Sequence, residues 1–98
     1  MDIKKTLDGN ALEIAVSGRL DTTTAPELEA VIKDSLDGVE SLKINMADLE
    51  YISSAGLRVL LSAQKTMSKQ GAMSVCGVNE IIMEIFEVTG FSDILTIE

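Results

Sequence analysis

The sequence predicts a single α/β domain with a mixed, mainly parallel sheet of about five strands and about three helices, in the order β-β-α-β-α-β-α-β. Three observations support this class. Apolar and polar residues alternate near the start of the chain, helical apolar periodicity recurs after it, and short apolar runs separate the helical stretches. Strands joined through a helix are expected to be parallel, whereas an opening hairpin is antiparallel. The 98 residues suffice for one modest core, so residues 1–98 are expected to form one domain.

The beginning of the chain is predicted to be a β-hairpin followed by a helix. Ile3 to Leu7 is the first strand, Asp8-Gly9-Asn10 is a turn whose residues tolerate positive φ, and residues 12–17 alternate as a second strand. The stretch Thr24-Ala25-Pro26-Glu27 has the spacing of a capping box, with a proline in the first turn. Asp37-Gly38 is predicted to end this first helix.

The middle of the chain is predicted to be a strand, a turn and a long helix. Residues 41–46 form the central strand, and residues 47–50 lead into the turn Tyr51-Ile52-Ser53-Ser54-Ala55-Gly56-Leu57. Apolar residues then recur at helical spacing, which predicts a helix that runs to Gln70 and stops at Gly71. This strand-to-helix turn is the stretch around which the rest of the chain is organised.

The two serines of this turn admit a structural and a functional interpretation. Ser53 or Ser54 is expected at the N-cap, where a serine can accept hydrogen bonds from the unpaired N–H groups of the first helical turn. The same N–H groups and the positive end of the helix dipole favour a phosphate on that hydroxyl. Ala55 and Gly56 are expected to leave the hydroxyl uncrowded. Both interpretations share one geometry.

The end of the chain is predicted to be a strand, a helix and a last strand. Residues 72–76 form a short apolar strand, and Asn79-Glu80 provides a cap and a first-turn acid for a third helix. Gly90 is placed to terminate that helix, and residues 94–97 are predicted to be the final strand.

Composition argues against a nucleic-acid partner, an oxidising compartment and a membrane span. The formal net charge of −8, from sixteen acidic and eight basic residues, argues against a nucleic-acid surface and favours basic partners. The single cysteine, Cys76, cannot form an intrachain disulfide, which suits a reducing cytoplasm, and it is expected to be a small buried hydrophobe. No signal-peptide core and no membrane-spanning apolar run is present, so we expect a soluble cytoplasmic protein.

The residue types argue against catalysis. Histidine is absent, so the commonest general base and metal ligand is missing. Asp21, Asp48 and Glu50 could converge at one end of the sheet, but carboxylates without a pocket are weak support for acid–base work. The turn does not match G-x-S-x-G, and there is no glycine-rich phosphate loop with its lysine. We therefore expect that the protein is not an enzyme and that it binds neither a cofactor nor a metal ion.

Three segments together resemble a known family. Gly18-Arg19-Leu20-Asp21, residues 49–57 and Val88-Thr89-Gly90-Phe91 resemble the STAS domain of bacterial anti-sigma factor antagonists across essentially the whole chain. In that family the strand-to-helix turn typically reads Asp-Ser-Ser-Gly-Leu, and the first serine of the pair is phosphorylated. The resemblance therefore implies that Ser54 is the phosphorylated residue and that Ser53 replaces the family's aspartate. Ala55 replaces the second serine, Gly56 and Leu57 are retained, and Ser53 is a minor alternative acceptor.

The resemblance also implies a switch between partners. The unphosphorylated protein would bind an anti-sigma factor serine kinase and free a sigma factor, phosphorylation would release the kinase, and a serine phosphatase would reset the cycle. The implied partner-binding residues lie in two segments: Asp21, Thr22, Thr23, Ser53, Ser54, Ala55, Gly56 and Leu57. The alternative is a STAS-like binding subunit of a membrane-associated complex, for example in lipid transport, that has no such switch.

Overall fold

A four-stranded sheet in the spatial order β1-β2-β3-β4 forms one layer of the molecule. The computed structural model describes all residues, 1–98. Its elements are β1 (Asp2–Asp8), β2 (Ala11–Leu20), α1 (Ala25–Ser35), β3 (Ser41–Ile52), α2 (Ser54–Met67), β4 (Ala72–Cys76), α3 (Glu80–Thr89) and the 3-10 helix η1 (Phe91–Asp93). The β1–β2 pair is antiparallel, and the β2–β3 and β3–β4 pairs are parallel. The predicted class and the predicted order of the elements up to α3 are confirmed.

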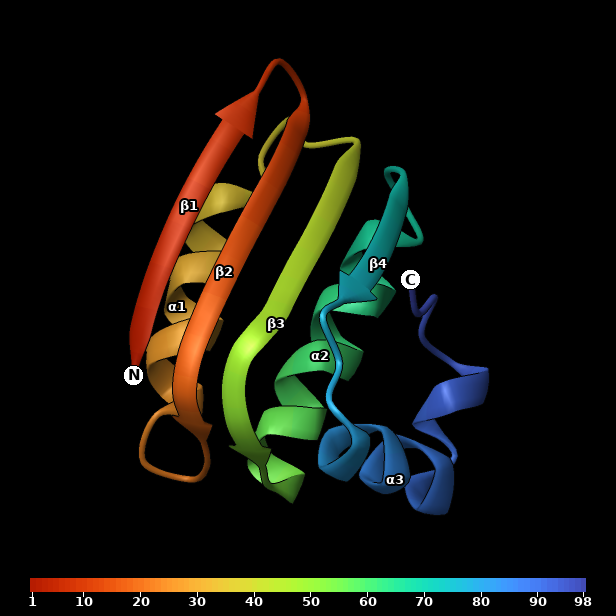
Figure 1. The fold of residues 1–98 in the computed structure, drawn as a ribbon. Coiled ribbons are helices and arrows are strands. Elements are labelled where there is room, and N and C mark those ends of the chain that lie inside the picture. The colour runs from red at the N-terminus through yellow and green to blue at the C-terminus, as the bar shows by residue number, and fades with distance from the viewer.

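The core lies between the sheet and the helices that pack on one of its faces. In Figure 1, α1 lies behind β1 and β2, α2 lies behind β3 and β4, and α3 lies near the lower end of the sheet. Every second residue enters the core in the first halves of β2 and β3, and the whole core contains 25 buried apolar residues. The fully buried members from β2 and β3 include Ile14, Ile44 and Met46. The opposite sheet face carries partly exposed polar and small side chains, so the structure has two layers.

The predicted fifth strand over residues 94–97 is absent as a strand. The chain instead forms η1 after α3, buries Leu95, and reaches the edge of β4 only at Ile97. There, the N–H of Val75 donates to the carbonyl of Thr96 at 2.9 Å, and the N–H of Glu98 donates to the carbonyl of Val75 at 2.8 Å. The expectation of about five strands was therefore wrong, because the 3-10 turn leaves too little chain to continue the ladder beyond one bridge.

Strand β3 is longer than predicted. The residue pattern predicts an end at Met46 and a connection over residues 47–50, whereas β3 continues to Ile52. The register between β2 and β3 shifts after Ala15, and Met46 and Leu49 are both buried although they are three positions apart. This irregularity breaks the period-two pattern, so the second half of the strand could not be recognised from alternation.

The ends of the last two long helices show where local signals determine a boundary. Helix α2 ends at Met67, before the predicted Gln70, whose side chain amide instead donates to the carbonyls of Leu36 and Val39. For α3 the predicted cap is confirmed, since Oδ1 of Asn79 accepts a hydrogen bond from the N–H of Ile82 at 2.9 Å. Gly90 ends α3 with φ of 82°, as predicted.

Candidate functional site

The turn from β3 into α2 begins at Ser53, which is the N-cap residue. Ser53 is extended, its N–H donates to the carbonyl of Leu20 at 2.8 Å, and its carbonyl accepts from the N–H of Leu57 at 3.0 Å. Its hydroxyl makes no capping bond: Oγ is inaccessible to solvent and has no hydrogen-bond partner. Ser53 is therefore an N-cap by backbone position only, because the buried hydroxyl does not satisfy the first helical turn.

Ser54 is the first residue of α2 and is exposed to solvent. No side chain caps the N–H groups of the first turn of this helix. An acceptor at Ser54 would therefore meet unpaired N–H groups and the positive end of the helix dipole. The prediction that Ser53 or Ser54 occupies the N-cap is confirmed for Ser53, and the accessible hydroxyl belongs to its neighbour.

Gly56 allows the start of α2 to pack directly on the ends of two strands. A Cβ at this position would lie 2.7 Å from Cγ of Leu20 and 2.8 Å from Cγ1 of Ile52. Gly56 and Leu57 are buried, so they hold the preceding residues in place from beneath and do not line the surface. The expectation that Gly56 leaves the serine uncrowded is wrong, because its missing side chain makes room for Leu20 and Ile52 of the core.

The loop between β2 and α1 lies at the same end of the sheet, because the parallel strands β2 and β3 end together. The carboxylate of Asp21 is hydrogen-bonded within this loop. Its Oδ1 accepts from the N–H of Thr23 at 3.0 Å and from the N–H of Thr24 at 3.2 Å. These hydrogen bonds hold the pKa of Asp21 below its usual value, and the bond from the N–H of Thr24 has the largest effect. Thr22 and Thr23 are exposed. The loop therefore presents two free threonines on a fixed backbone.

The predicted capping box of α1 does not form. Thr24 is the N-cap, yet its hydroxyl donates to the carbonyl of Arg19 at 2.7 Å and accepts from the N–H of Asp21 at 2.9 Å. Because this side chain is bonded to the end of β2, it is unavailable to the N–H of Glu27, which donates to the carbonyl of Thr24 instead. Thr24 thus secures the loop rather than the helix.

The three carboxylates suggested as a converging group do not form a cluster, and Glu50 is an exposed residue of β3. Asp48 lies within β3 opposite Ser17 and borders a hollow on the open sheet face with Asp2, whereas Asp21 lies in the loop before α1. No group of three or more His, Cys, Asp or Glu side chains is arranged to hold a metal ion. None of the helices is long and apolar enough to cross a membrane.

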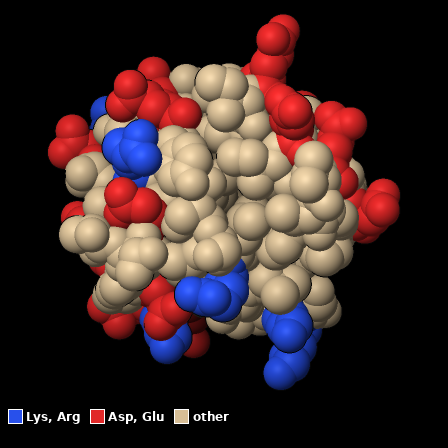
Figure 2. All heavy atoms as spheres, turned by 90° about the horizontal axis from the view of Figure 1, so that it is seen from below, with Lys and Arg blue, Asp and Glu red and all other residues tan.

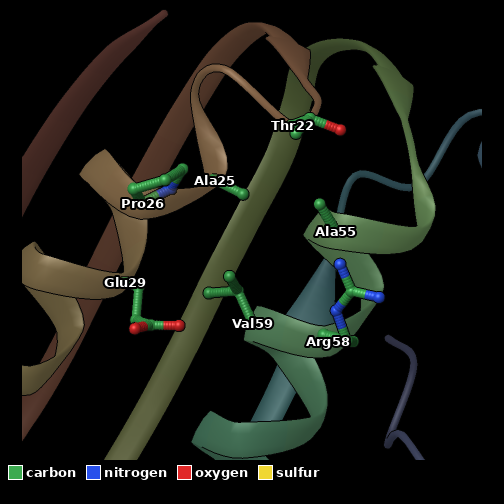
Figure 3. A pocket seen from close by; sticks show the side chains of 7 residues that line it. All are labelled: Thr22, Ala25, Pro26, Glu29, Ala55, Arg58 and Val59. Atoms are coloured by element: carbon green, nitrogen blue, oxygen red, sulfur yellow. The ribbon is translucent and has the colours of Figure 1, made fainter.

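A groove separates the N-terminal halves of α1 and α2 (Figure 3). It encloses about 250 Å³ and is lined by Thr22, Ala25, Pro26, Glu29, Ala55, Arg58 and Val59. In Figure 3 the side chains of α1 and its preceding loop stand on one side and those of α2 on the other. Two of the predicted site residues, Thr22 and Ala55, therefore face one hollow although they come from different segments.

Arg58 lines this groove and is not among the residues that the sequence pointed to. It lies one helical turn after Ser54, is exposed, and takes part in none of the ion pairs of the structure. In Figure 3 its guanidinium extends along α2 toward Ala55, which is toward the start of the helix. The spacing of four residues from Ser54 was a signal that could have identified it, because such residues are neighbours on a helix.

The surface at this end of the molecule is uncharged at its centre and carries charges around it. Figure 2 shows it from below, with uncharged atoms over the centre and acidic and basic side chains toward the edge. At the ends of β2 and β3 the guanidinium of Arg19 lies 4.6 Å from the ring centre of Tyr51 and 3.9 Å from Asp21. An uncharged centre with charges at its edge is the usual anatomy of a protein–protein interface.

Curated relatives match this chain over most of their length. The anti-sigma-B factor antagonist of Staphylococcus aureus (strain NCTC 8325) is 30% identical over 97 residues, which are 97% of this chain and 90% of the relative. That of Staphylococcus epidermidis is 32% identical over 85 residues, which are 85% of this chain and 79% of the relative.

Solved structures share the fold at lower sequence identity. An anti-sigma factor antagonist from Mycobacterium paratuberculosis has a TM-score of 0.89 and 23% identity over 98% of this chain and 83% of that chain. The phosphorylated Bacillus cell fate determinant SpoIIAA has a TM-score of 0.77 and 15% identity over 99% of this chain and 91% of that chain. A sulfate transporter family protein from Wolinella succinogenes has a TM-score of 0.74 and 19% identity over 85% of this chain and 69% of that chain.

The family comparison covers nearly every residue of the chain. Residues 2–98 match the model of the STAS domain family. This match includes both segments that the structure brings together, the β2–α1 loop and the start of α2. With the two staphylococcal relatives it leads to one conclusion: the chain belongs to the STAS domain family.

Proposed function

We propose that this protein is an anti-sigma factor antagonist that, with Ser54 unphosphorylated, binds an anti-sigma factor serine kinase and so releases a sigma factor for transcription. The observation that carries the proposal is the exposed Ser54 at the first residue of α2, whose neighbour Ala55 lines a groove together with Thr22 of the β2–α1 loop. The names of the staphylococcal relatives support the same function.

Phosphorylation of Ser54 would change the surface more than the fold. A phosphate adds about −1.5 to −2 charges and three strong acceptor oxygens. The uncapped first turn of α2 can donate N–H groups to these oxygens, and the helix dipole favours their charge. We therefore expect the domain to remain folded in both forms.

The consequence would appear in the complex with the partner. An interface formed around an uncharged serine would have to bury the phosphate or leave it facing acidic groups, and either costs binding free energy. Asp21 carries a negative charge in the neighbouring loop, and the N–H groups of Thr24 and Thr23 that lower its pKa stabilise that charge. Phosphorylation would thus release the kinase, and a serine phosphatase would restore binding.

The geometry favours Ser54 over Ser53 as the acceptor. Oγ of Ser53 is buried, so a kinase would have to open the turn to reach it, whereas Ser54 is exposed. We propose that Asp21, Thr22 and Thr23 form the partner-binding surface with Ser54, and that the buried Ala55 contributes only where it lines the groove. Gly56 and Leu57 would act from the core, by fixing the start of α2.

The protein would act as a binding module in the cytoplasm and not as an enzyme. Its sequence lacks histidine, and the groove between α1 and α2 offers one carboxylate and one guanidinium as ionisable groups. The printed names of its relatives describe antagonists of anti-sigma factors. This proposal requires no cofactor.

A second candidate function is an unswitched binding subunit of a membrane-associated complex, for example one that transports lipids. The observation that favours it is Ser53, which stands where the family typically has an aspartate. If that carboxylate is needed for phosphorylation, Ser54 would be only the first residue of a helix.

The first experiment is mass spectrometry of the protein recovered from its native cells under several growth conditions. Trypsin releases residues 44–58, and we expect one phosphate on Ser54 whose occupancy varies with conditions. If the unmodified peptide is well detected and the phosphate is consistently absent, the unswitched subunit replaces the switch as our interpretation.

The second experiment measures binding to the kinase encoded nearest to this gene. We expect Ser54→Ala to bind and Ser54→Asp to bind at least about tenfold more weakly. Ser41→Asp is the matched control, because it adds the same charge at an exposed position where β3 begins, at the other end of the strand. Equal binding of the two Ser54 variants would refute the proposed switch.

A further inference from the structure

Helix α3 has a second apolar face that the fold does not use. Its inner face buries Ile82 and Phe86 completely. On another face Ile81 is 61% exposed and Val88 is 81% exposed, and the half-buried Ile85 lies between them. The spacing of four and then three residues places these three side chains in one row on the helix, which we call the α3 stripe.

The α3 stripe borders a shallow hollow of about 320 Å³. Glu84 and Thr89 complete its lining. The hydroxyl of Thr89 donates to the carbonyl of Ile85 at 2.6 Å, so its hydrogen is already used within the helix. Exposed aliphatic side chains that gather around one hollow mark an interaction site more often than scattered ones do.

The charges beside the α3 stripe indicate which kind of partner it can bind. Helix α3 contains three glutamates, Glu80, Glu84 and Glu87, and no basic residue. They form a second row with the same spacing, one residue ahead of the α3 stripe, and none of them takes part in an ion pair. A second copy of this helix would bring like charges together, and an anionic membrane surface would be repelled.

We propose that the α3 stripe docks an amphipathic helix of a partner protein that presents aliphatic side chains flanked by lysines or arginines. The aliphatic side chains would fill the hollow over Ile81, Ile85 and Val88, while the basic ones would pair with Glu84 and its neighbouring glutamates. This recognition uses the apolar spacing of helix-in-groove complexes. It requires neither Ser54 nor its phosphorylation, so it is independent of the proposed function.

The test uses a synthetic helical peptide of about 14 residues with leucines spaced by four and three positions and lysines beside them. The same peptide with glutamates in place of the lysines is the charge control. Titration of the isotopically labelled full chain by NMR is expected to shift the amides of α3 with the lysine peptide only. No shift, or equal shifts with both peptides, would overturn the proposal.

Variants of the protein separate docking from folding. The double variant Ile81→Ser with Val88→Ser removes exposed side chains, so it is expected to fold and to bind the lysine peptide at least about tenfold more weakly. Leu7→Ser is the matched control, because Leu7 is 63% exposed on β1, and it is expected to leave binding unchanged. Unchanged binding of the double variant would contradict the assignment of the site.

The same variants distinguish other occupants of this face. If the α3 stripe joined two copies of the chain, sedimentation would show a concentration-dependent dimer that the double variant abolishes. If it bound lipid, the protein would float with vesicles that contain anionic lipid. Either result would overturn the proposal in favour of self-association or membrane binding.

Discussion

The N-termini of α2 and α3 provide a paired test of how these helices are held. Asn79 makes two side-chain bonds: its Oδ1 accepts from the N–H of Ile82 at 2.9 Å, and its Nδ2 donates to the carbonyl of Leu49 at 2.9 Å. Ser53 has the corresponding position before α2, but its buried hydroxyl makes no bond. We predict opposite effects on stability when each is replaced by alanine.

The expected magnitudes follow from these contacts. Loss of a side-chain cap costs about 1 kcal/mol, and loss of a further hydrogen bond that leaves its partner unsatisfied costs about 1–2 kcal/mol. Asn79→Ala should therefore lower the free energy of unfolding by about 2–3 kcal/mol. Ser53→Ala removes an unsatisfied buried hydroxyl, so it should leave stability unchanged or raise it by up to about 1 kcal/mol.

Urea unfolding followed by circular dichroism measures both variants against the unmodified chain at constant pH. Ser54→Ala is the control, because it makes the same chemical change as Ser53→Ala at an exposed site and should stay within about 0.5 kcal/mol of the parent. A loss of more than about 1 kcal/mol in Ser53→Ala would refute the reasoning, because the hydroxyl would then have a stabilising partner. A loss below about 0.5 kcal/mol in Asn79→Ala would refute the cap assignment.

Gly71→Ala should destabilise the protein by about 3 kcal/mol or more in urea unfolding, because the added Cβ would lie 1.8 Å from the carbonyl oxygen of Glu40; a loss under about 1 kcal/mol would show that the backbone yields there. The pKa of Asp21 is lowered in the folded protein, chiefly by the Thr24 N–H, so its carboxylate stabilises the fold above the unfolded pKa of about 4 and loses this effect as the pH falls through the lower folded value. Thermal unfolding should accordingly show a smaller difference between Asp21→Asn and the parent at pH ~2.5 than at pH ~7, and an equal difference would contradict the assignment. Cys76 is half-buried and not fully buried as predicted, but burial still raises the pKa of its thiol, so iodoacetamide should alkylate it more slowly in the native protein than in urea, whereas an equal or faster native rate would contradict this assignment.

Sequence reasoning succeeded where a structure is determined within a short window of the chain. Asn79 and Gly90 mark the two ends of α3 because a cap and a left-handed residue act on atoms of their own helix turn. It failed at the capping box of Thr24, whose spacing was correct but whose hydroxyl is bonded to the end of β2. The hydrogen bonds of the Thr24 hydroxyl to the end of β2 therefore replace the capping bond that the local spacing predicts.

The candidate site was predictable as a pair of segments but not as a surface. The sequence selected the Asp21 loop and the Ser53-Ser54 turn, and the parallel pairing of β2 with β3 places them at one end of the sheet. Which serine is exposed, and that Arg58 borders the adjacent groove, became visible only in three dimensions. Helical spacing suggests that Arg58 is near Ser54, but not that it remains without an ion-pair partner.

The sequence by itself determined the class of this protein, the order of its elements up to α3 and the strand-to-helix turn on which the proposed function rests. These depend on periodicity and turn chemistry, which are properties of neighbouring residues. Only the tertiary structure decided the length of β3, the loss of the last strand and the burial of Gly56 beneath the serines. Those features depend on contacts between segments that are distant in the chain, such as Leu20 with Gly56, and no local pattern records such contacts.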